Sequence, residues 1–372
     1  MNYFEFNNKN HADTNFCDKH GNKWEKSKKT YSLKAGLKSK LPVLLKVFLL
    51  IIIITWISGA VSAHTVVKSS LSDIKVKNTT VMVEQGFSGT VTIKDPLLNK
   101  TANVTVKYRP YGSGSGFIVN KKGYIITAFH VVSDPNTIEY KNKLKKMNSS
   151  NVKWYVEEIG LMEYLEHNNT KLGYQLFKDV PNNEIAFEKA LTKTTNTFIK
   201  NGWLSASSYE HDIYVKGNVF KKINTSGTLK ASLIDFGNCR NNEDIALLKV
   251  ETNGTNLPTL TISAKSPKSW TKVSVYGYPY NKKKSSTSKS SGYLIKKTHN
   301  SKGIVYYKTN AITAAGYSGG PAVNSRNKVI GVLVYGIYIE VGKHERNIGS
   351  LFLSAYYIKK ICKKDKVSIR VS

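Results

Sequence analysis

A serine enclosed by glycines, placed just ahead of an apolar run, most constrains the fold of this 372-residue chain. Residues 316–321 read Gly-Tyr-Ser-Gly-Gly-Pro, and the apolar residues 329–334 follow. Glycines permit a tight turn. Such a turn, leading into a strand, exposes the Ser318 side chain for attack while nearby backbone N–H groups converge on a developing oxyanion. The stretch fits a nucleophile turn, and it also fits a flexible loop.

Two further stretches favour the nucleophile. His130 stands at the end of an apolar segment that follows a glycine-bearing turn, and Asp244 stands directly before the apolar segment 245–250. Taken singly, a histidine at a strand end is usually structural, and an aspartate before a strand is usually a turn residue. Together they place three chemically active side chains at strand ends in the order His130, Asp244, Ser318.

The three motifs, in this order, resemble the trypsin/chymotrypsin-like serine proteases. They read Thr-Ala-Phe-His at residues 127–130, Asp-Ile-Ala-Leu-Leu at 244–248 and Gly-Tyr-Ser-Gly-Gly-Pro at 316–321. The stretch Gly-Ser-Gly-Ser-Gly-Phe-Ile-Val at residues 112–119, which we interpret as a turn entering a strand, is similar to the HtrA (Do-type) branch. The resemblance runs from about residue 81 to about residue 362. It implies a mainly β fold, the chymotrypsin-like double six-stranded β-barrel.

The resemblance also implies a role for each of these side chains. Ser318 would be the nucleophile, His130 the general base, and Asp244 the group that orients the imidazole. The backbone N–H groups of Gly316 and Ser318 would form the oxyanion hole. The reaction implied is hydrolysis of peptide bonds in polypeptide substrates, with no cofactor and no metal.

By the same resemblance, Ile312 floors the pocket for the P1 side chain, the one before the scissile bond. Thr313 and the strand residues Val334, Tyr335 and Gly336 lie beside it. No acidic residue stands among these five. We therefore expect a small or medium apolar P1 residue rather than lysine or arginine.

The sequence divides into seven segments by composition and pattern. They are a disordered cytoplasmic tail (1–40), a transmembrane signal-anchor or signal peptide (41–63), a linker (64–80), the start of the first β-barrel (81–132), a helical insertion (133–210), the end of the first barrel (211–255), and the second barrel with a C-terminal helix (256–372). Within the last segment, the polar residues 282–292 are expected to form a flexible loop.

Residues 41–63 are apolar apart from Lys46, and they are long enough to span a membrane. The preceding tail is rich in lysine, so the tail should stay in the cytoplasm and the rest of the chain should lie outside. We favour an uncleaved anchor. The alternative is a secreted protein cleaved after Ala63, because residues 61–63 are small.

The segment 133–210 interrupts the resemblance just after His130. Residues 152–165 and 185–191 have helical spacing of apolar residues. An insertion of this length is either functional, as a lid or docking element beside the cleft, or an addition that packs on the barrel. Both interpretations remain open.

The formal net charge of +31 comes mostly from lysine, because the chain has only five arginines. Lysine without a recognition motif does not indicate nucleic-acid binding, and we expect a solvated lysine-rich surface. Attraction to anionic envelope polymers or lipid headgroups is a further hypothesis.

The three cysteines, Cys17, Cys239 and Cys362, do not have the spacing of a metal site. Cys239 and Cys362 either pair or stay unpaired. After Cys362 only ten residues remain, too few for the PDZ domain of many HtrA-like proteins. The oligomeric state stays open.

Three functions are therefore weighed. The favoured one is an exported serine endopeptidase, with envelope protein quality control as a candidate role. The alternatives are a catalytically silent protease-like binding module and an envelope-binding structural protein. Substitution of Ser318 separates the first from the other two.

Overall fold

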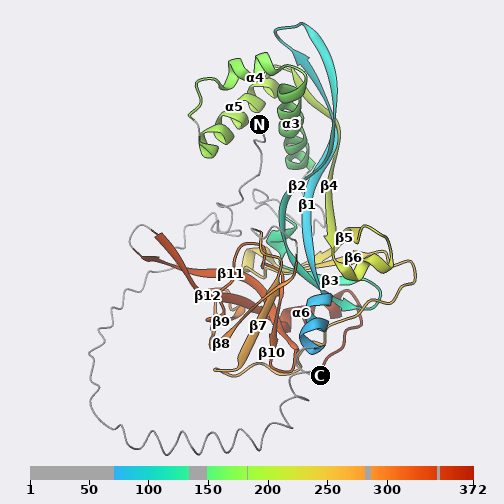
Figure 1. Ribbon diagram of the computed structural model, residues 1–372, viewed down its shortest axis with the longest axis vertical. Coiled ribbons are helices and arrows are strands. Elements are labelled where there is room, and N and C mark those ends of the chain that lie inside the picture. Colours follow the sequence, from blue (N-terminus) through green and yellow to red (C-terminus); the bar gives the residue numbers. More distant parts are fainter. Residues whose placement is uncertain (1–70, 134–148, 182, 281–285, 342–343) are drawn as a thin grey trace, which may run out of the picture.

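The structure is a computed structural model that describes residues 71–133, 149–181, 183–280, 286–341 and 344–372. Two closed β-barrels of six strands each make up most of it. In Figure 1 both barrels occupy the lower half, and three long strands rise above them with helices at their side. This confirms the expected mainly β fold with two six-stranded barrels.

The first barrel has the strand order β1-β2-β3-β6-β5-β4, with every neighbouring pair antiparallel. Its strands are β1 (Thr80–Asp95), β2 (Lys100–Asn120), β3 (Tyr124–Thr127), β4 (Leu204–Lys216), β5 (Thr228–Phe236) and β6 (Ala246–Val250). Three short 3-10 helices connect them, namely η1 (Phe129–Val131), η2 (Asn218–Lys222) and η3 (Cys239–Asn241). Closure removes the sheet edges.

The second barrel has the order β10-β11-β12-β9-β8-β7 and is also antiparallel throughout. Its strands are β7 (Lys272–Gly277), β8 (Ser288–His299), β9 (Val305–Thr309), β10 (Pro321–Asn324), β11 (Val329–Val341) and β12 (His344–Ser354). Helix α6 (Ala355–Lys364) follows β12, and the Ser354 side chain caps its first turn.

One apolar core joins the two barrels. It includes Phe117 and Leu247 from the first barrel and Tyr276, Val334 and Leu353 from the second, each at most 1% exposed. Burial of this shared surface fixes how the barrels pack against each other. Residues at the barrel junction therefore have defined positions, and the candidate site lies there.

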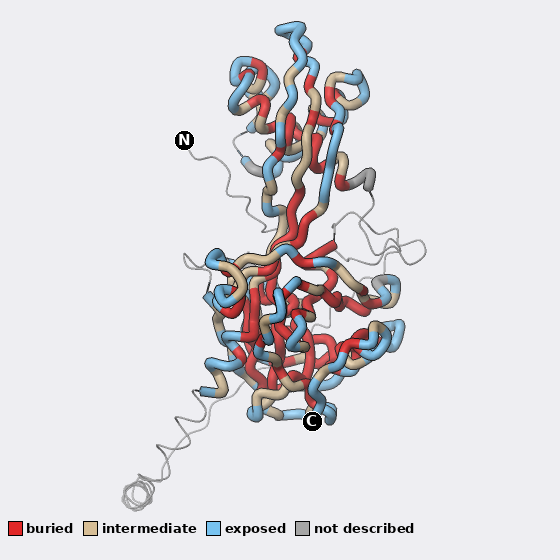
Figure 2. The backbone as a smooth tube through the Cα atoms, turned by 90° about the vertical axis from the view of Figure 1, so that its right-hand side faces the viewer, coloured by how far each residue is buried: buried red, intermediate tan, exposed pale blue. Residues whose placement is uncertain are grey.

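Three helices lie between β3 and β4 in sequence: α3 (Ser149–His167), α4 (Thr170–Phe177) and α5 (Glu184–Lys200). They pack on the parts of β1, β2 and β4 that extend beyond the first barrel (Figure 1). We call these helices and strand extensions the helical lobe. It has its own apolar core, which includes Phe87, Val91, Leu161 and Phe198, and Figure 2 shows buried segments in this upper part as well as in the barrels.

Close packing of α3 on β1 depends on glycine. A Cβ atom at Gly160 would lie 2.3 Å from the Val91 side chain, and one at Gly89 would lie 2.8 Å from the Val156 side chain of α3. Both distances are shorter than van der Waals contact. The helix therefore lies against the strand without an intervening side chain.

The insertion ends earlier than the sequence indicates. We expected it to extend to residue 210, but β4 begins at Leu204 and pairs with β1 as far as Ile93. Only Leu204 and Ala206 are buried in this stretch, and the side chains between them are exposed and polar. A strand whose outer face is solvated and carries small polar residues gives only a weak pattern of alternating apolar residues in the sequence. Helix α4 was also missed, because it is short. The Asn169 side chain caps its first turn.

The linker prediction was wrong for residues 71–79, which are helical. Val76 is 1% exposed in the shared core. The Asp73 carboxylate accepts a hydrogen bond from the Tyr276 hydroxyl at 2.7 Å and pairs with Lys289 at 2.5 Å. These contacts with the second barrel order a segment that its polar composition marks as a linker.

Two loop predictions also need correction. Residues 288–292, expected within a flexible loop, belong to β8 and pair with β7 from Gly277 to Val273. Residues 112–116, expected as a turn, lie inside β2 and pair with β1. Both segments are rich in serine and glycine, a composition that suggested turns. In the structure these residues are paired within strands.

The predicted tail and membrane span, residues 1–40 and 41–63, lie outside the described residues. In the part of the chain that the structure describes, no helix combines the length and apolar character needed to cross a membrane. Cys362 is a free buried thiol, so it does not pair with Cys239 in this structure. Burial raises the pKa of the Cys362 thiol to about 12.

Candidate active site

The ends of two paired strands bring His130 and Asp244 together. Thr127 at the end of β3 is opposite Ala246 at the start of β6. His130 then lies in η1 and Asp244 just before β6. The His130 Nδ1 atom is 2.6 Å from Asp244 Oδ2, and the His130 backbone N–H donates to Asp244 Oδ1 at 3.0 Å. With Nδ1 donating to the carboxylate, Nε2 is the nitrogen that can accept a proton.

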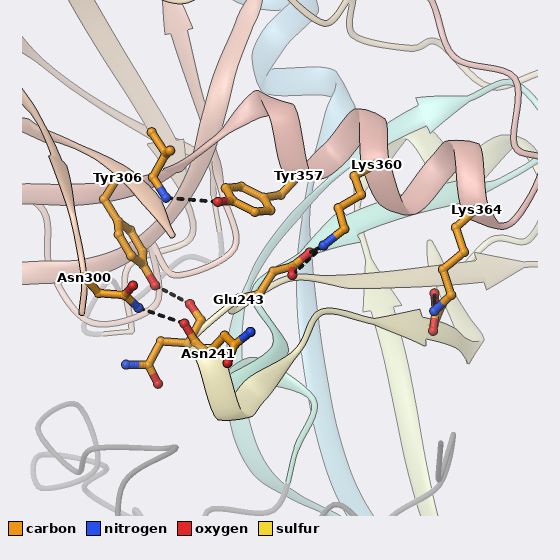
Figure 3. Close-up of polar contacts among 10 residues, drawn as sticks. Asn241, Glu243, Asn300, Tyr306, Tyr357, Lys360 and Lys364 are labelled. Atoms are coloured by element: carbon orange, nitrogen blue, oxygen red, sulfur yellow. Dashed lines mark hydrogen bonds and ion pairs between the residues drawn. The ribbon is translucent and has the colours of Figure 1, made fainter. Parts of the chain in front are cut away.

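The segment before Asp244 is held by the second barrel and by α6 (Figure 3). Three contacts fix residues 241–243: the Asn300 side-chain amide donates to the Asn241 carbonyl at 2.7 Å, the Tyr306 hydroxyl donates to the Asn242 carbonyl, and Lys360 Nζ contacts the two Glu243 carboxylate oxygens at 2.9 and 3.1 Å. Glu243 is 4% exposed. A residue of the first barrel is therefore positioned partly by the second.

The turn that carries Ser318 requires its glycines. Gly316 and Gly319 have φ values of +92° and +83°, in the left-handed region that favours glycine. A Cβ atom at Gly316 would lie 2.1 Å from the Tyr278 carbonyl oxygen, and one at Gly319 would lie 2.0 Å from the Ser115 carbonyl oxygen. The glycine pattern thus reflects close backbone contacts on both sides of a half-buried serine.

The Ser318 backbone and Val131, the residue after His130, approach each other across Gly114. A Cβ atom at Gly114 would lie 2.6 Å from the side chain of Val131 and 2.9 Å from the Ser318 carbonyl oxygen. Within the described residues no hydrogen bond joins the Ser318 hydroxyl to the His130 ring. The structure therefore bonds His130 to Asp244 and places the Ser318 backbone carbonyl close to Gly114, beside Val131.

The two N–H groups predicted for the oxyanion hole are available. The intervening and following N–H groups donate within the loop: Tyr317 to Ala314 at 3.3 Å, Gly319 to Leu333 at 2.8 Å and Gly320 to Tyr317 at 2.9 Å. In the described part of the chain, neither Gly316 nor Ser318 donates its N–H to a protein acceptor. These two donors can bind an external oxygen.

Ile312 and Thr313, expected at and beside the floor of the substrate pocket, differ in exposure. Ile312 is 58% exposed, while its neighbours Ala311 and Thr313 are at most 6% exposed. Residues alternate between two sides in an extended segment, so Ile312 points outward and Thr313 inward. The Thr313 hydroxyl is 2.9 Å from the Ser350 hydroxyl.

A side chain that the sequence did not identify links the two expected walls of the pocket. The Asn347 side-chain amide donates to the Thr313 carbonyl at 2.6 Å. Its nitrogen would also be 3.1 Å from a Cβ atom at Gly336, and the Tyr338 ring would be 2.7 Å from that atom. Asn347 and Tyr338 therefore occupy the space beside Gly336. No local signal marks them, since β12 pairs with β11 only in the folded barrel.

The other expected wall residues lie near His130 or in the core. The Tyr335 ring is nearly parallel to the His130 ring, with an interplanar angle of 12° and 6.2 Å between centroids. Val334 is 1% exposed and belongs to the shared core. Across the described residues, no group of three or more His, Cys, Asp or Glu side chains is placed to hold a metal ion.

Comparison with protein families gives a match to the family described as Trypsin-like peptidase domain, over residues 201–332. The matched part starts just after α5 and contains Asp244 and Ser318, while His130 lies before the helices. A search of curated proteins finds no match. The match and the two barrels support a trypsin/chymotrypsin-like fold. The trypsin-like peptidase domain further suggests a serine protease, a hydrolase whose substrates are polypeptides.

Proposed function

We propose that this protein is a serine endopeptidase that uses Ser318, His130 and Asp244 as its catalytic triad. The observation that carries the proposal is the double contact of Asp244 with the His130 ring and backbone, at 2.6 and 3.0 Å. It lies beside a glycine turn that offers two unused N–H groups. A nucleophile, a base, a residue that orients the base and oxyanion donors are the parts that acyl transfer needs.

In the proposed mechanism, the Ser318 hydroxyl attacks the substrate carbonyl carbon while His130 Nε2 takes its proton. Asp244 stabilises the imidazolium that forms. The N–H groups of Gly316 and Ser318 bind the oxyanion. His130 then protonates the leaving amine, and water hydrolyses the acyl-enzyme by the same steps in reverse. Hydrogen bonds between a catalytic serine and its base often form only with substrate bound, so the absent Ser318–His130 bond is compatible with this mechanism.

We further propose a preference for small or medium apolar P1 residues. Thr313 and Ser350 are buried hydroxyl residues, and Asn347 takes up room beside Gly336. No carboxylate is present among the expected pocket residues to pair with lysine or arginine. Chromogenic peptides that differ only at P1 provide the test. We expect alanine and valine to be cleaved faster than lysine, and faster cleavage after lysine contradicts the preference.

The finer identity and location are part of the proposal and rest on sequence. The Gly-Ser stretch at 112–119 favours the HtrA type. The apolar residues 41–63 favour an anchor that leaves the protease domain outside the cytoplasm, in a role such as envelope protein quality control. The excess of lysine supports contact with anionic envelope polymers, testable by salt elution from cell envelopes.

The deciding experiment is labelling of the full-length chain by a fluorophosphonate, which reacts with activated serines. We expect labelling of Ser318 that is lost in Ser318→Ala and in His130→Ala and retained in Ser207→Ala, an exposed serine of the helical lobe. Absence of labelling in the folded protein, with unfolded polypeptide added, contradicts the proposal and favours the binding module.

A further inference from the structure

Ser115 of β2 is a fully buried residue that uses all of its polar groups at the candidate site. Its N–H donates to the Ser318 carbonyl at 2.7 Å, and its hydroxyl donates to the Gly316 carbonyl at 2.6 Å. The hydroxyl also accepts from the Tyr278 N–H at 2.8 Å, and the Ser115 carbonyl accepts from the Thr127 hydroxyl at 2.7 Å. A first-barrel residue therefore holds the nucleophile turn of the second barrel.

The two carbonyls that Ser115 binds belong to Gly316 and Ser318, the same residues whose N–H groups are unused. Ser115 holds these carbonyls, which lie in the peptide units 316–317 and 318–319, directly after the two oxyanion donors. It therefore restricts rotation about the Cα–C bonds of Gly316 and Ser318. The Ser318 contact comes from the backbone of Ser115 and survives any substitution there. The Gly316 contact depends on the hydroxyl alone.

The backbone conformation of Gly316 depends on the hydrogen bond from the Ser115 hydroxyl more than that of a non-glycine residue would. Glycine populates positive and negative φ about equally well, so its own conformational preference does not hold φ at +92°. The Tyr278 N–H joins the same hydroxyl, and the Tyr278 carbonyl would be 2.1 Å from a Cβ atom at Gly316. The Ser115 hydroxyl thus ties Gly316 to the turn against which it packs.

We infer that Ser115 is a positioning residue that orients the Gly316 N–H for binding the oxyanion. The inference rests on the proposed function, since an oxyanion hole has meaning only in an acyl-transfer enzyme. The hydroxyl holds the 316–317 peptide, and the Ala315 carbonyl, in the peptide that contains the Gly316 N–H, accepts from the Tyr280 N–H at 3.0 Å. Without the hydroxyl, the Gly316 carbonyl is released and the backbone angles of Gly316 can change. The Gly316 N–H then leaves the position that the tetrahedral intermediate requires. The N–H of Ser318 stays in place.

The test is steady-state cleavage of an alanine-P1 peptide by full-length Ser115→Ala and Ser115→Cys. Removing one oxyanion donor typically lowers kcat by about a hundredfold to a thousandfold, and misplacing one should cost about tenfold to a hundredfold. We expect this loss in kcat for Ser115→Ala with KM within about twofold. Ser115→Cys adds no branch and keeps a weak donor, so it should be intermediate and remains informative if the alanine variant does not fold.

A second readout separates positioning from mere stability. A peptide aldehyde, which forms a tetrahedral adduct with the serine, should bind Ser115→Ala more weakly by about the same factor as kcat falls. The matched control is Ser274→Ala, which removes a buried hydroxyl bonded to Ser291 at 3.0 Å in the second barrel. It should lower thermal stability without changing kcat or aldehyde affinity.

The outcomes distinguish this inference from the proposed function. If the wild-type chain cleaves peptides and folded Ser115→Ala matches it in kcat and aldehyde affinity, the inference is wrong and the function stands. Equal losses in Ser115→Ala and Ser274→Ala also overturn it. If the wild-type chain neither cleaves peptides nor reacts with fluorophosphonate, the proposed function fails first.

Discussion

Asp244 uses its two carboxylate oxygens for two different parts of His130. Oδ1 accepts from the backbone N–H and Oδ2 faces the ring Nδ1. The first contact fixes where the residue lies, and the second fixes how its ring is turned and which nitrogen is free. An asparagine could keep the first contact, but its NH2 group would face Nδ1 and favour the wrong tautomer.

We therefore predict that Asp244→Asn leaves the protein folded and lowers kcat by about 10⁴, the effect of a wrong tautomer in a triad. Peptide hydrolysis and thermal unfolding measure the two parts of this prediction. The control is Asp235→Asn, another buried aspartate of the first barrel, which pairs with Lys364. Activity of Asp244→Asn within tenfold of the wild type contradicts the role assigned to Asp244.

At this scale the sequence identified residues whose neighbours form local motifs, such as Ser318 between glycines. It missed residues that act through distant contacts. Ser115 and Gly316 are 201 positions apart, and Asn347 reaches Thr313 from another strand. For Ile312 and Thr313, spacing along the chain does not tell which of the two side chains is exposed and which is buried.

Helix α6 contacts the segment that precedes Asp244 of the candidate site. Lys360 is the residue of α6 that contacts Glu243, next to Asp244 (Figure 3). Because Glu243 is buried, loss of its cationic partner leaves a carboxylate without compensation. Helix α6, which follows the second barrel, thus contacts the residue next to Asp244, the proposed third member of the triad in the first barrel.

We predict that Lys360→Met lowers kcat severalfold and lowers the free energy of unfolding by about 1–3 kcal/mol, the usual cost of an unsatisfied buried polar group. Urea denaturation and peptide hydrolysis measure these changes. Lys359→Met, one position along α6, does not remove the Glu243 contact and should behave like the wild type. A Lys360→Met enzyme with unchanged kcat would show that Asp244 does not depend on this contact.

The helical lobe contains a carboxyl that titrates near neutrality. The pKa of Glu158 is raised to about 7, mainly by burial; the Thr192 hydrogen bond lowers it and the nearby Glu188 charge contributes to the rise. The folded protein then binds a proton more tightly than the unfolded chain, whose glutamate has a pKa near 4.5. The stabilisation is fully present below about pH 4.5 and is lost as the pH rises through about 7.

We predict that Glu158→Gln, which keeps an acceptor for Thr192 and stays neutral, stabilises the lobe at pH 8 and has little effect at pH 5. The gain should be on the order of 3 kcal/mol, given a shift of about 2.5 pKa units and about 1.4 kcal/mol per unit. Urea midpoints at the two pH values test it. The exposed residue Glu210 supplies a control in Glu210→Gln. An equal effect of Glu158→Gln at both pH values contradicts the assigned pKa.

Elements with apolar periodicity were predictable, and elements with polar faces were not. The helical spacing at residues 152–165 corresponds to part of α3, whereas the start of β4 and the helical residues 71–79 carry polar side chains on most positions. Their order comes from pairing with β1 and from contacts such as Asp73 with Tyr276. Such contacts become visible only when the partner segments are placed in space.

On the scale of the whole molecule, the lobe and the barrels have separate apolar cores. Leu161 and Leu247 are both fully buried, one in each core. Truncating a buried leucine to alanine costs about 2–5 kcal/mol. Leu161→Ala should therefore destabilise the lobe, and Leu247→Ala the barrels, by a similar free energy of unfolding.

We predict that in Leu161→Ala the lobe unfolds in urea before fluorophosphonate labelling of Ser318 is lost, and that labelling without urea stays within about twofold of the wild type. Fluorescence of Trp154 and Trp203, which pack on the lobe core, follows the first event. In Leu247→Ala labelling should be lost early. Simultaneous loss of labelling and lobe fluorescence in Leu161→Ala would mean that the two cores unfold as one.

The pair of barrels was predictable because short motifs at strand ends are tied to one topology. The arrangement of the lobe was not, since β1, β2 and β4 continue from the barrel into it without a break in the sequence. Nothing local separates the barrel part of β1 from the lobe part, apart from the irregular pairing near Gly86. Domain boundaries drawn along the chain therefore cut through strands that belong to both.

The division of the proposed triad between barrels has a consequence for synthesis. His130 and Asp244 are made first, the serine on the later barrel follows, and Lys360, which holds the segment before Asp244, comes later still. A growing chain therefore carries the complete proposed triad only after residue 318 has emerged. Such an order protects a nascent protease from cutting itself and its neighbours before it has folded.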